Sequence, residues 1–179
     1  MHGPVLVGWL LVALCGGTGA YCLLRLRGTA GAARRSAGVE GAMGVVMAVM
    51  ALPGLPASAA VALALGAVSG GVALWAGVPG PSAPPHRAHH VAEGAAMAYM
   101  AVAMAAGGGH GGAHGPSGVP ALTGGLLLYF GLHALRCGPL LVPVRAGGGG
   151  HGPAVAEPEL SAACRGALAA GMFVMLLSL

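Results

Sequence analysis

Long apolar stretches alternate with short polar or glycine- and proline-rich connections along the whole chain. A membrane-spanning helix needs about 20 mostly apolar residues, and six stretches meet that requirement. We expect them at roughly 4–24, 38–55, 57–78, 89–106, 119–137 and 160–179. The pattern therefore predicts an all-α fold, a polytopic transmembrane helical bundle that forms a single domain over residues 1–179.

The composition agrees with a protein that lies in a lipid bilayer. Hydrophobic residues make up 56% of the chain and charged residues only 7%, whereas soluble domains carry about 25% charged residues. The net charge of +4 comes from arginines that are spread between apolar stretches, so it does not indicate a nucleic-acid partner. No nucleophile elbow, phosphate loop or His-Glu-x-x-His motif is present, and we predict a protein that is not an enzyme.

The arginines also predict the orientation of the bundle. All of them lie around the loops that follow the first, third and fifth stretches: Arg25, Arg27, Arg34, Arg35, Arg87, Arg136, Arg145 and Arg165. Because basic residues concentrate on the cytoplasmic side of membrane proteins, these three loops are expected in the cytoplasm. Both termini are then extracytoplasmic.

Two of the predicted helices carry one carboxylate followed by a row of methionines. The rows are Glu40, Met43, Met47 and Met50 in the second helix, and Glu93, Met97, Met100 and Met104 in the fourth. At about 100° per residue, each row forms a single stripe on its helix. An ionisable group in an apolar helix suggests function, and thioethers suit soft metals. Two structural explanations stay open, since acids favour the first turn of a helix and methionine fills irregular gaps.

Histidines are expected near the same depth as these two carboxylates. His89 and His90 precede Glu93 by one turn, and His133 lies near the cytoplasmic end of the fifth helix. If the second, fourth and fifth helices are neighbours, these groups and Glu40 form one inner ligand set for a metal ion. The alternative for His89 and His90 is an interfacial position beside a proline-rich loop.

The cysteines and the loop histidines give weaker signals. The four cysteines do not form a disulfide framework; they are expected as small apolar fillers, with Cys22, Cys137 or Cys164 as soft ligands in the alternative. His110 and His114 lie in a glycine-rich outer loop, a composition that is more typical of a linker than of a metal site.

Five stretches, taken together, form a specific pattern: Met1–Cys15, Gly19–Arg25, Glu40–Pro53, His89–Met100 and Pro158–Arg165. This pattern resembles actinobacterial integral membrane proteins of the family catalogued as domain of unknown function 5134. The resemblance implies six spans in an actinobacterial plasma (inner) membrane. It implies no activity and no catalytic residue.

The functional hypothesis that follows is a non-enzymatic membrane protein that binds or handles a soft transition metal, copper first. Glu40, His89, His90, Glu93 and His133 would be the inner ligands, and the methionine rows would lead outward to the loop of His110 and His114. One alternative is a structural or assembly subunit of a membrane complex, or a homo-oligomer, built through small-residue interfaces. A third is a haem protein with His133 and His89 or His90 as axial ligands, although only 4% of the residues are aromatic.

Overall fold

A computed structural model gives the fold over residues 3–54, 58–81, 83–84, 86–107, 118–138 and 156–178. These residues form α-helices and connecting turns, and no strand occurs among them. The helices are α1 (Gly3–Arg25), α2 (Gly31–Met50), α3 (Ala59–Gly77), α4 (Arg87–Gly107), α5 (Pro120–Cys137) and α6 (Ala156–Leu177). Each helix lies on one of the six apolar stretches that the sequence analysis expects.

The ends of α2 differ most from the expected 38–55. The helix begins at Gly31, after Ala30 in an extended conformation, and it ends at Met50. The expected boundary followed the change from polar to apolar residues, but Arg34 and Arg35 continue the helix because nothing between them and the apolar part breaks it. At the other end Pro53 cannot continue a helix.

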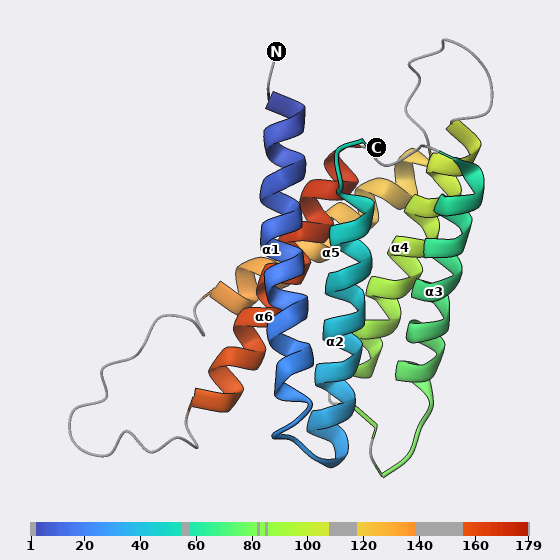
Figure 1. Ribbon diagram of the computed structural model, residues 1–179. Helices are drawn as coiled ribbons and strands as arrows, with labels where there is room; N and C mark the ends of the chain where they lie inside the picture. Colours follow the sequence, from blue (N-terminus) through green and yellow to red (C-terminus); the bar gives the residue numbers. More distant parts are fainter. Residues whose placement is uncertain are drawn as a thin grey trace.

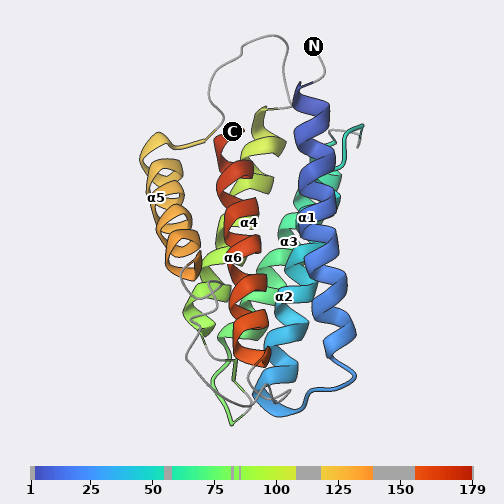
Figure 2. The same ribbon diagram turned by 90° about the vertical axis from the view of Figure 1, so that its left-hand side faces the viewer.

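The six helices form three antiparallel hairpins, α1–α2, α3–α4 and α5–α6 (Figure 1). The three returning helices α2, α4 and α6 run in the same direction and contact one another. Figure 2 shows α6 between α5 and α1, and both neighbours pack against it. The second helix of each hairpin therefore lies toward the inside of the bundle.

Most of the methionines pack in the core that these inner helices share. The buried ones are Met43, Met47, Met97, Met100, Met172 and Met175, together with Phe130 and Leu168. Met50 is half-buried at the edge of this core, and Met104 is 41% exposed. The rows on α2 and α4 are therefore packing residues over most of their length, as expected where flexible side chains fill gaps between small residues.

Among the residues that the structure describes, three helices are long and apolar enough to cross a membrane: α1 from Val5, α3, and α6 from Leu160. Large apolar side chains are exposed along the outside of the bundle, including Leu74 and Leu135 at 77% and 73%. An apolar outer surface of this kind fits lipid and not water. These features are those of a membrane protein. The other three helices have 18 or more residues, but they carry more polar side chains.

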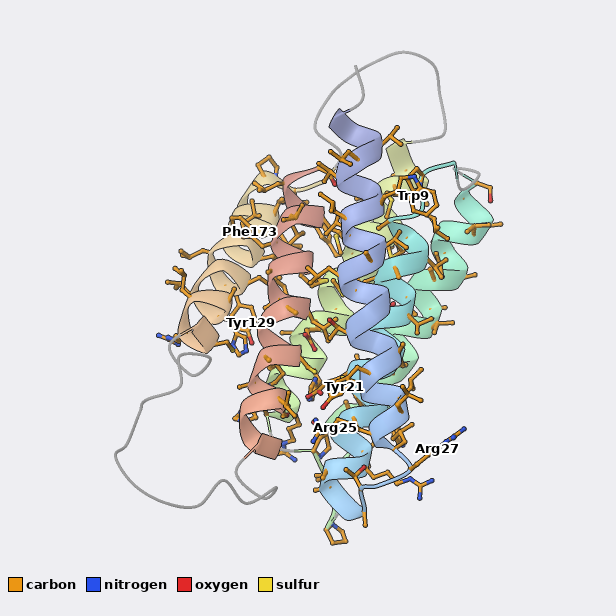
Figure 3. All side chains as sticks on the ribbon, turned by 60° about the vertical axis from the view of Figure 1, so that its left-hand side comes forward. Trp9, Tyr21, Arg25, Arg27, Tyr129 and Phe173 are labelled. Carbon is orange, nitrogen blue, oxygen red and sulfur yellow. The ribbon has the colours of Figure 1, made fainter. Side chains whose placement is uncertain are left out.

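The arginines of the described residues gather at one end of the bundle. Figure 3 shows Arg25 and Arg27 at that end and Trp9 near the other end. α2, α4 and α6 begin toward that end and α1 ends there, while α5 runs toward it but stops short of the other helices. The chain termini lie at the opposite end (Figure 1). Arg145 lies outside the described residues.

Candidate metal centre

The first two turns of α4 carry three polar side chains that are buried in the bundle. His89, His90 and Glu93 are 4%, 0% and 2% exposed. His90 Nδ1 lies 3.1 Å from Glu93 Oε2 and donates a hydrogen bond to it. His89 Nε2 lies 3.3 Å from Glu93 Oε1, but these two atoms do not meet the angular requirement of a hydrogen bond. Residues three and four apart share a helix face, so both imidazoles reach one carboxylate.

Helix α5 adds Tyr129 and His133 to this group. The Tyr129 hydroxyl lies 3.0 Å from His89 Nδ1. The rings of His89 and His133 are stacked, with centroids 3.7 Å apart and planes 16° from parallel. We call His89, His90, Glu93, Tyr129 and His133 the histidine site. Tyr129 was missed in the sequence, although it lies four residues before His133 and therefore on the same face of the helix.

Four buried atoms of the histidine site have no hydrogen-bond partner in the described structure. They are Nε2 of His89, His90 and His133 and Oε1 of Glu93. A buried polar atom left without a partner costs about 1–3 kcal/mol, and most such atoms in proteins are satisfied. Three imidazole nitrogens and one carboxylate oxygen in one site are therefore unusual, and each can donate an electron pair to a metal ion.

Glu40, on α2, makes its direct contacts with residues other than the histidines. Its Oε1 accepts a hydrogen bond of 3.1 Å from Ser36 Oγ and lies 3.7 Å from Nη1 of Arg165. Its Oε2 accepts a hydrogen bond from Cys22 Sγ at 3.6 Å. The carboxylate is 1% exposed, so a buried charge is paired and hydrogen-bonded, as it must be.

A second buried thiol lies near this group. Cys164 directly precedes Arg165 on α6, and α6 packs against α1, which carries Cys22. We call Cys22, Ser36, Glu40, Cys164 and Arg165 the Glu40 site. The two sites are adjacent, since α2 packs against α4 and Met43, one turn after Glu40, lies against Gly94, which directly follows Glu93.

The expected single inner ligand set is thus divided between two neighbouring sites. The structure brings His133 against His89 and leaves Glu40 with Cys22, Ser36 and Arg165. Within the part of the chain that the structure describes, no three histidine, cysteine or acidic side chains are arranged to hold one metal ion as they stand. His110 and His114 lie outside the described residues, as does the rest of their loop.

The comparisons with known proteins agree with the sequence pattern. The model of the family described as domain of unknown function (DUF5134) matches residues 32–179. The chain belongs to this family. The match to DUF5134 includes both sites except Cys22, and it does not include the two opening stretches on which the resemblance also drew. No curated protein and no solved structure matches the chain significantly.

Proposed function

We propose that all six helices cross the plasma (inner) membrane, with the arginine-bearing end in the cytoplasm and both termini outside. The three clearly apolar helices and the collection of the arginines at one end support this arrangement. The polar side chains that make α2, α4 and α5 less apolar include Glu40, Glu93 and His133, and these face other helices and not the outside. Polar groups that face the bundle interior are compatible with spanning helices.

Cysteine labelling tests this topology. Gly28 and Ala59 are exposed at opposite ends of the bundle, and the native thiols are buried. In intact cells, a membrane-impermeant maleimide is expected to label Ala59→Cys and to leave Gly28→Cys unlabelled until the membrane is permeabilised. The unsubstituted chain gives the background. Labelling of Gly28→Cys in intact cells would overturn the orientation.

We infer that the protein binds a soft transition metal at the histidine site, and copper is the metal that we favour. The observation that carries this proposal is the set of buried imidazole nitrogens of His89, His90 and His133 without hydrogen-bond partners. Neutral imidazole is a ligand for copper, zinc, iron and nickel, and thioethers favour copper in its monovalent form. The buried thioethers of α2 and α4 lie further along the same helices.

Metal binding at the histidine site requires local rearrangement. Because the rings of His89 and His133 stack face to face, their nitrogens do not converge on one point. His89 Nε2 already lies 3.3 Å from Glu93 Oε1, so it is the His133 ring that would have to rotate about its side-chain bonds to turn its Nε2 toward the same carboxylate. Tyr129 holds Nδ1 of His89, which leaves Nε2 as the nitrogen that binds metal.

Competition with a copper(I) chelator tests the proposal in the purified protein. The double variant His89→Ala, His133→Ala is expected to bind copper at least about 10-fold more weakly than the wild type, since even the loss of an outer-shell partner costs roughly 10–100-fold. The matched control is His110→Ala, His114→Ala, which removes two histidines from the outer loop. Equal affinity in the wild type and the His89→Ala, His133→Ala variant would refute the histidine site.

The purified wild-type protein also tests the two alternatives to copper binding, a haem protein and a structural or assembly subunit. A Soret absorption band in the purified protein would favour a haem protein over a copper protein. Absence of any competable copper, together with stable co-purification of a membrane partner, would favour a structural or assembly subunit.

A further inference from the structure

An open cavity lies at the arginine-bearing end of the bundle, where the start of α2 meets the end of α3. The cavity has a volume of about 510 Å³, and its lining includes Leu26, Arg34, Arg35, Trp75 and Val78. The two arginines come from the start of α2, and Trp75 comes from the last turn of α3. We call this space the arginine cavity. None of its lining residues belongs to the histidine site or the Glu40 site.

Arg35 is held in place in the arginine cavity and keeps a free hydrogen-bond donor. Its guanidinium carbon lies 5.0 Å from the ring centroid of Trp75, which is a cation–π distance. Its Nη2 donates a hydrogen bond to the backbone oxygen of the same residue. Its Nε is buried and has no hydrogen-bond partner in the described structure. A guanidinium fixed in this way is suited to bind an anionic oxygen.

The positive charge of the arginine cavity is not neutralised within the described part of the chain. No carboxylate of the described residues pairs with Arg34 or Arg35. The cavity also contains Gly31, the first residue of α2, and the preceding Ala30 gives this helix no side-chain cap. The positive end of the helix dipole therefore adds to the attraction for an anion.

An apolar groove continues from the arginine cavity along the outside of α3 and α4. It shares Val78 with the cavity, has a volume of about 630 Å³, and follows Gly77, Leu74 and Gly70 along α3. Leu74 is highly exposed, and a Cβ at Gly70 would meet no atom within 4 Å, so this part of the groove is open. From Gly77 to Gly70 the helix rises about 10 Å. The groove therefore runs from the arginine-bearing end toward the middle of an apolar helix.

We propose that the arginine cavity and this groove bind one anionic phospholipid, with the phosphate beside Arg34 and Arg35 and an acyl chain in the groove. Arginine binds phosphate through two parallel hydrogen bonds, and basic pockets between membrane helices bind anionic headgroups. A free phosphate ion would occupy the cavity but not the groove, so their continuity at Val78 favours a lipid. The proposal requires that α3 lies in a membrane, and it does not depend on metal binding at the histidine site.

Tryptophan fluorescence tests the proposal in the full-length protein. The chain has two tryptophans, and Trp9 lies near the other end of the bundle (Figure 3), so Trp9→Phe leaves Trp75 as the reporter. This variant is reconstituted in vesicles of phosphatidylcholine and phosphatidylglycerol, in which one lipid at a time carries bromine on its acyl chains and quenches nearby tryptophan. One arginine near an anionic lipid strengthens binding about fivefold, so two predict a preference of roughly 25-fold for phosphatidylglycerol.

The headgroup contact is tested by removing the two arginines in the Trp9→Phe background. Arg34→Gln, Arg35→Gln is expected to lose most of the preference for phosphatidylglycerol. The matched control is Arg27→Gln, Arg136→Gln, which removes two exposed arginines that do not line the cavity. The control is expected to keep the preference.

The acyl-chain contact is tested without changing a charge. Gly70→Leu fills the groove and is expected to reduce the preference severalfold. Gly71→Leu is the matched control, because a Cβ at Gly71 also meets no atom within 4 Å and this residue does not line the groove. Equal preference in these two variants would overturn binding in the groove, and this comparison decides the question if the arginine variant loses its helical circular dichroism.

Three further results would overturn the lipid site. One is equal quenching of Trp75 by the two brominated lipids at equal mole fraction in the Trp9→Phe protein. Another is equal loss of preference in Arg34→Gln, Arg35→Gln and in its matched control, which would assign the preference to the overall charge of the surface. The third is displacement of brominated phosphatidylglycerol by soluble glycerol phosphate, which would show a site for a free anion.

Discussion

Replacing Gly94 by alanine is expected to separate α4 from α3 and to disturb the histidine site beside it. A Cβ at this position would lie 2.8 Å from the backbone oxygen of Ser69 and 2.9 Å from Cε of Met43, and it would also collide with the Cβ of Ala73. The Ser69 oxygen is 0.6 Å closer than the 3.4 Å at which ordinary contact begins. Because that oxygen belongs to the backbone of α3, the helices themselves must shift.

The magnitude follows from two opposing terms. Overpacking costs about 1–3 kcal/mol, and three simultaneous contacts place Gly94→Ala in the upper part of that range. Alanine in place of glycine in a helix returns at most about 1 kcal/mol. The expected net loss is therefore about 1–2 kcal/mol in the free energy of unfolding.

Gly70→Ala is the matched control in the same hairpin. A Cβ at Gly70 meets no atom within 4 Å, so this variant keeps the gain in helix propensity without the packing cost. The two variants should therefore differ by about 2–3 kcal/mol in reversible denaturant unfolding in detergent micelles, followed by circular dichroism. Equal stabilities would refute the close approach of α4 to α3. Gly94→Ala should also bind copper more weakly, because the shifted helix carries three of the metal-site side chains.

Two further changes test single hydrogen bonds. Ser36→Ala removes the 3.1 Å hydrogen bond to Glu40 and should destabilise the protein by about 1.5–3 kcal/mol, the range for hydrogen bonds to charged groups. A change below about 0.5 kcal/mol, the usual limit for surface substitutions, would indicate that the bond is not formed. Tyr99→Phe removes a 2.7 Å contact with the Thr123 hydroxyl and a hydrogen bond of the same length from the Val119 amide. Its expected cost is about 1–3 kcal/mol for the two bonds together, and protease cleavage next to α5 should become faster.

The sequence predicted the helices well because each apolar stretch is long enough to be a helix whatever its neighbours are. It also predicted the depth of the polar groups, since depth depends only on the number of residues from the end of a helix. This is why His133 and His89 were expected at one level, and the structure brings them into contact.

Neighbours in the bundle were harder to predict, because they depend on how each helix is rotated and on which hairpins pack together. Glu40 was expected with the histidines, but its face of α2 meets Cys22 and Arg165. A signal for this arrangement was present in the sequence. Cys22 comes one turn before Arg25, and Cys164 directly precedes Arg165, so both thiols had to lie at the depth of Glu40.

The methionine rows and the polar groups have different physical explanations, although both lie on α2 and α4. The rows are accounted for by packing, since Met43, Met47, Met97 and Met100 lie in the shared core. The carboxylates are not accounted for in this way. An acidic side chain within a membrane-spanning helix costs roughly 2.5–3.5 kcal/mol at the bilayer centre, and an apolar residue would avoid that cost.

The helix dipole stabilises an acidic side chain near the start of a helix, but this interaction contributes only about 0.3–1 kcal/mol. The helix dipole also gives no reason for buried histidines beside the acid. Glu93 meets two imidazoles and Glu40 meets a thiol, an alcohol and a guanidinium. Groups that are this costly to bury and that converge from several helices are expected where a ligand or a proton is held. The case for metal binding therefore depends on these two adjacent sites and not on the number of methionines.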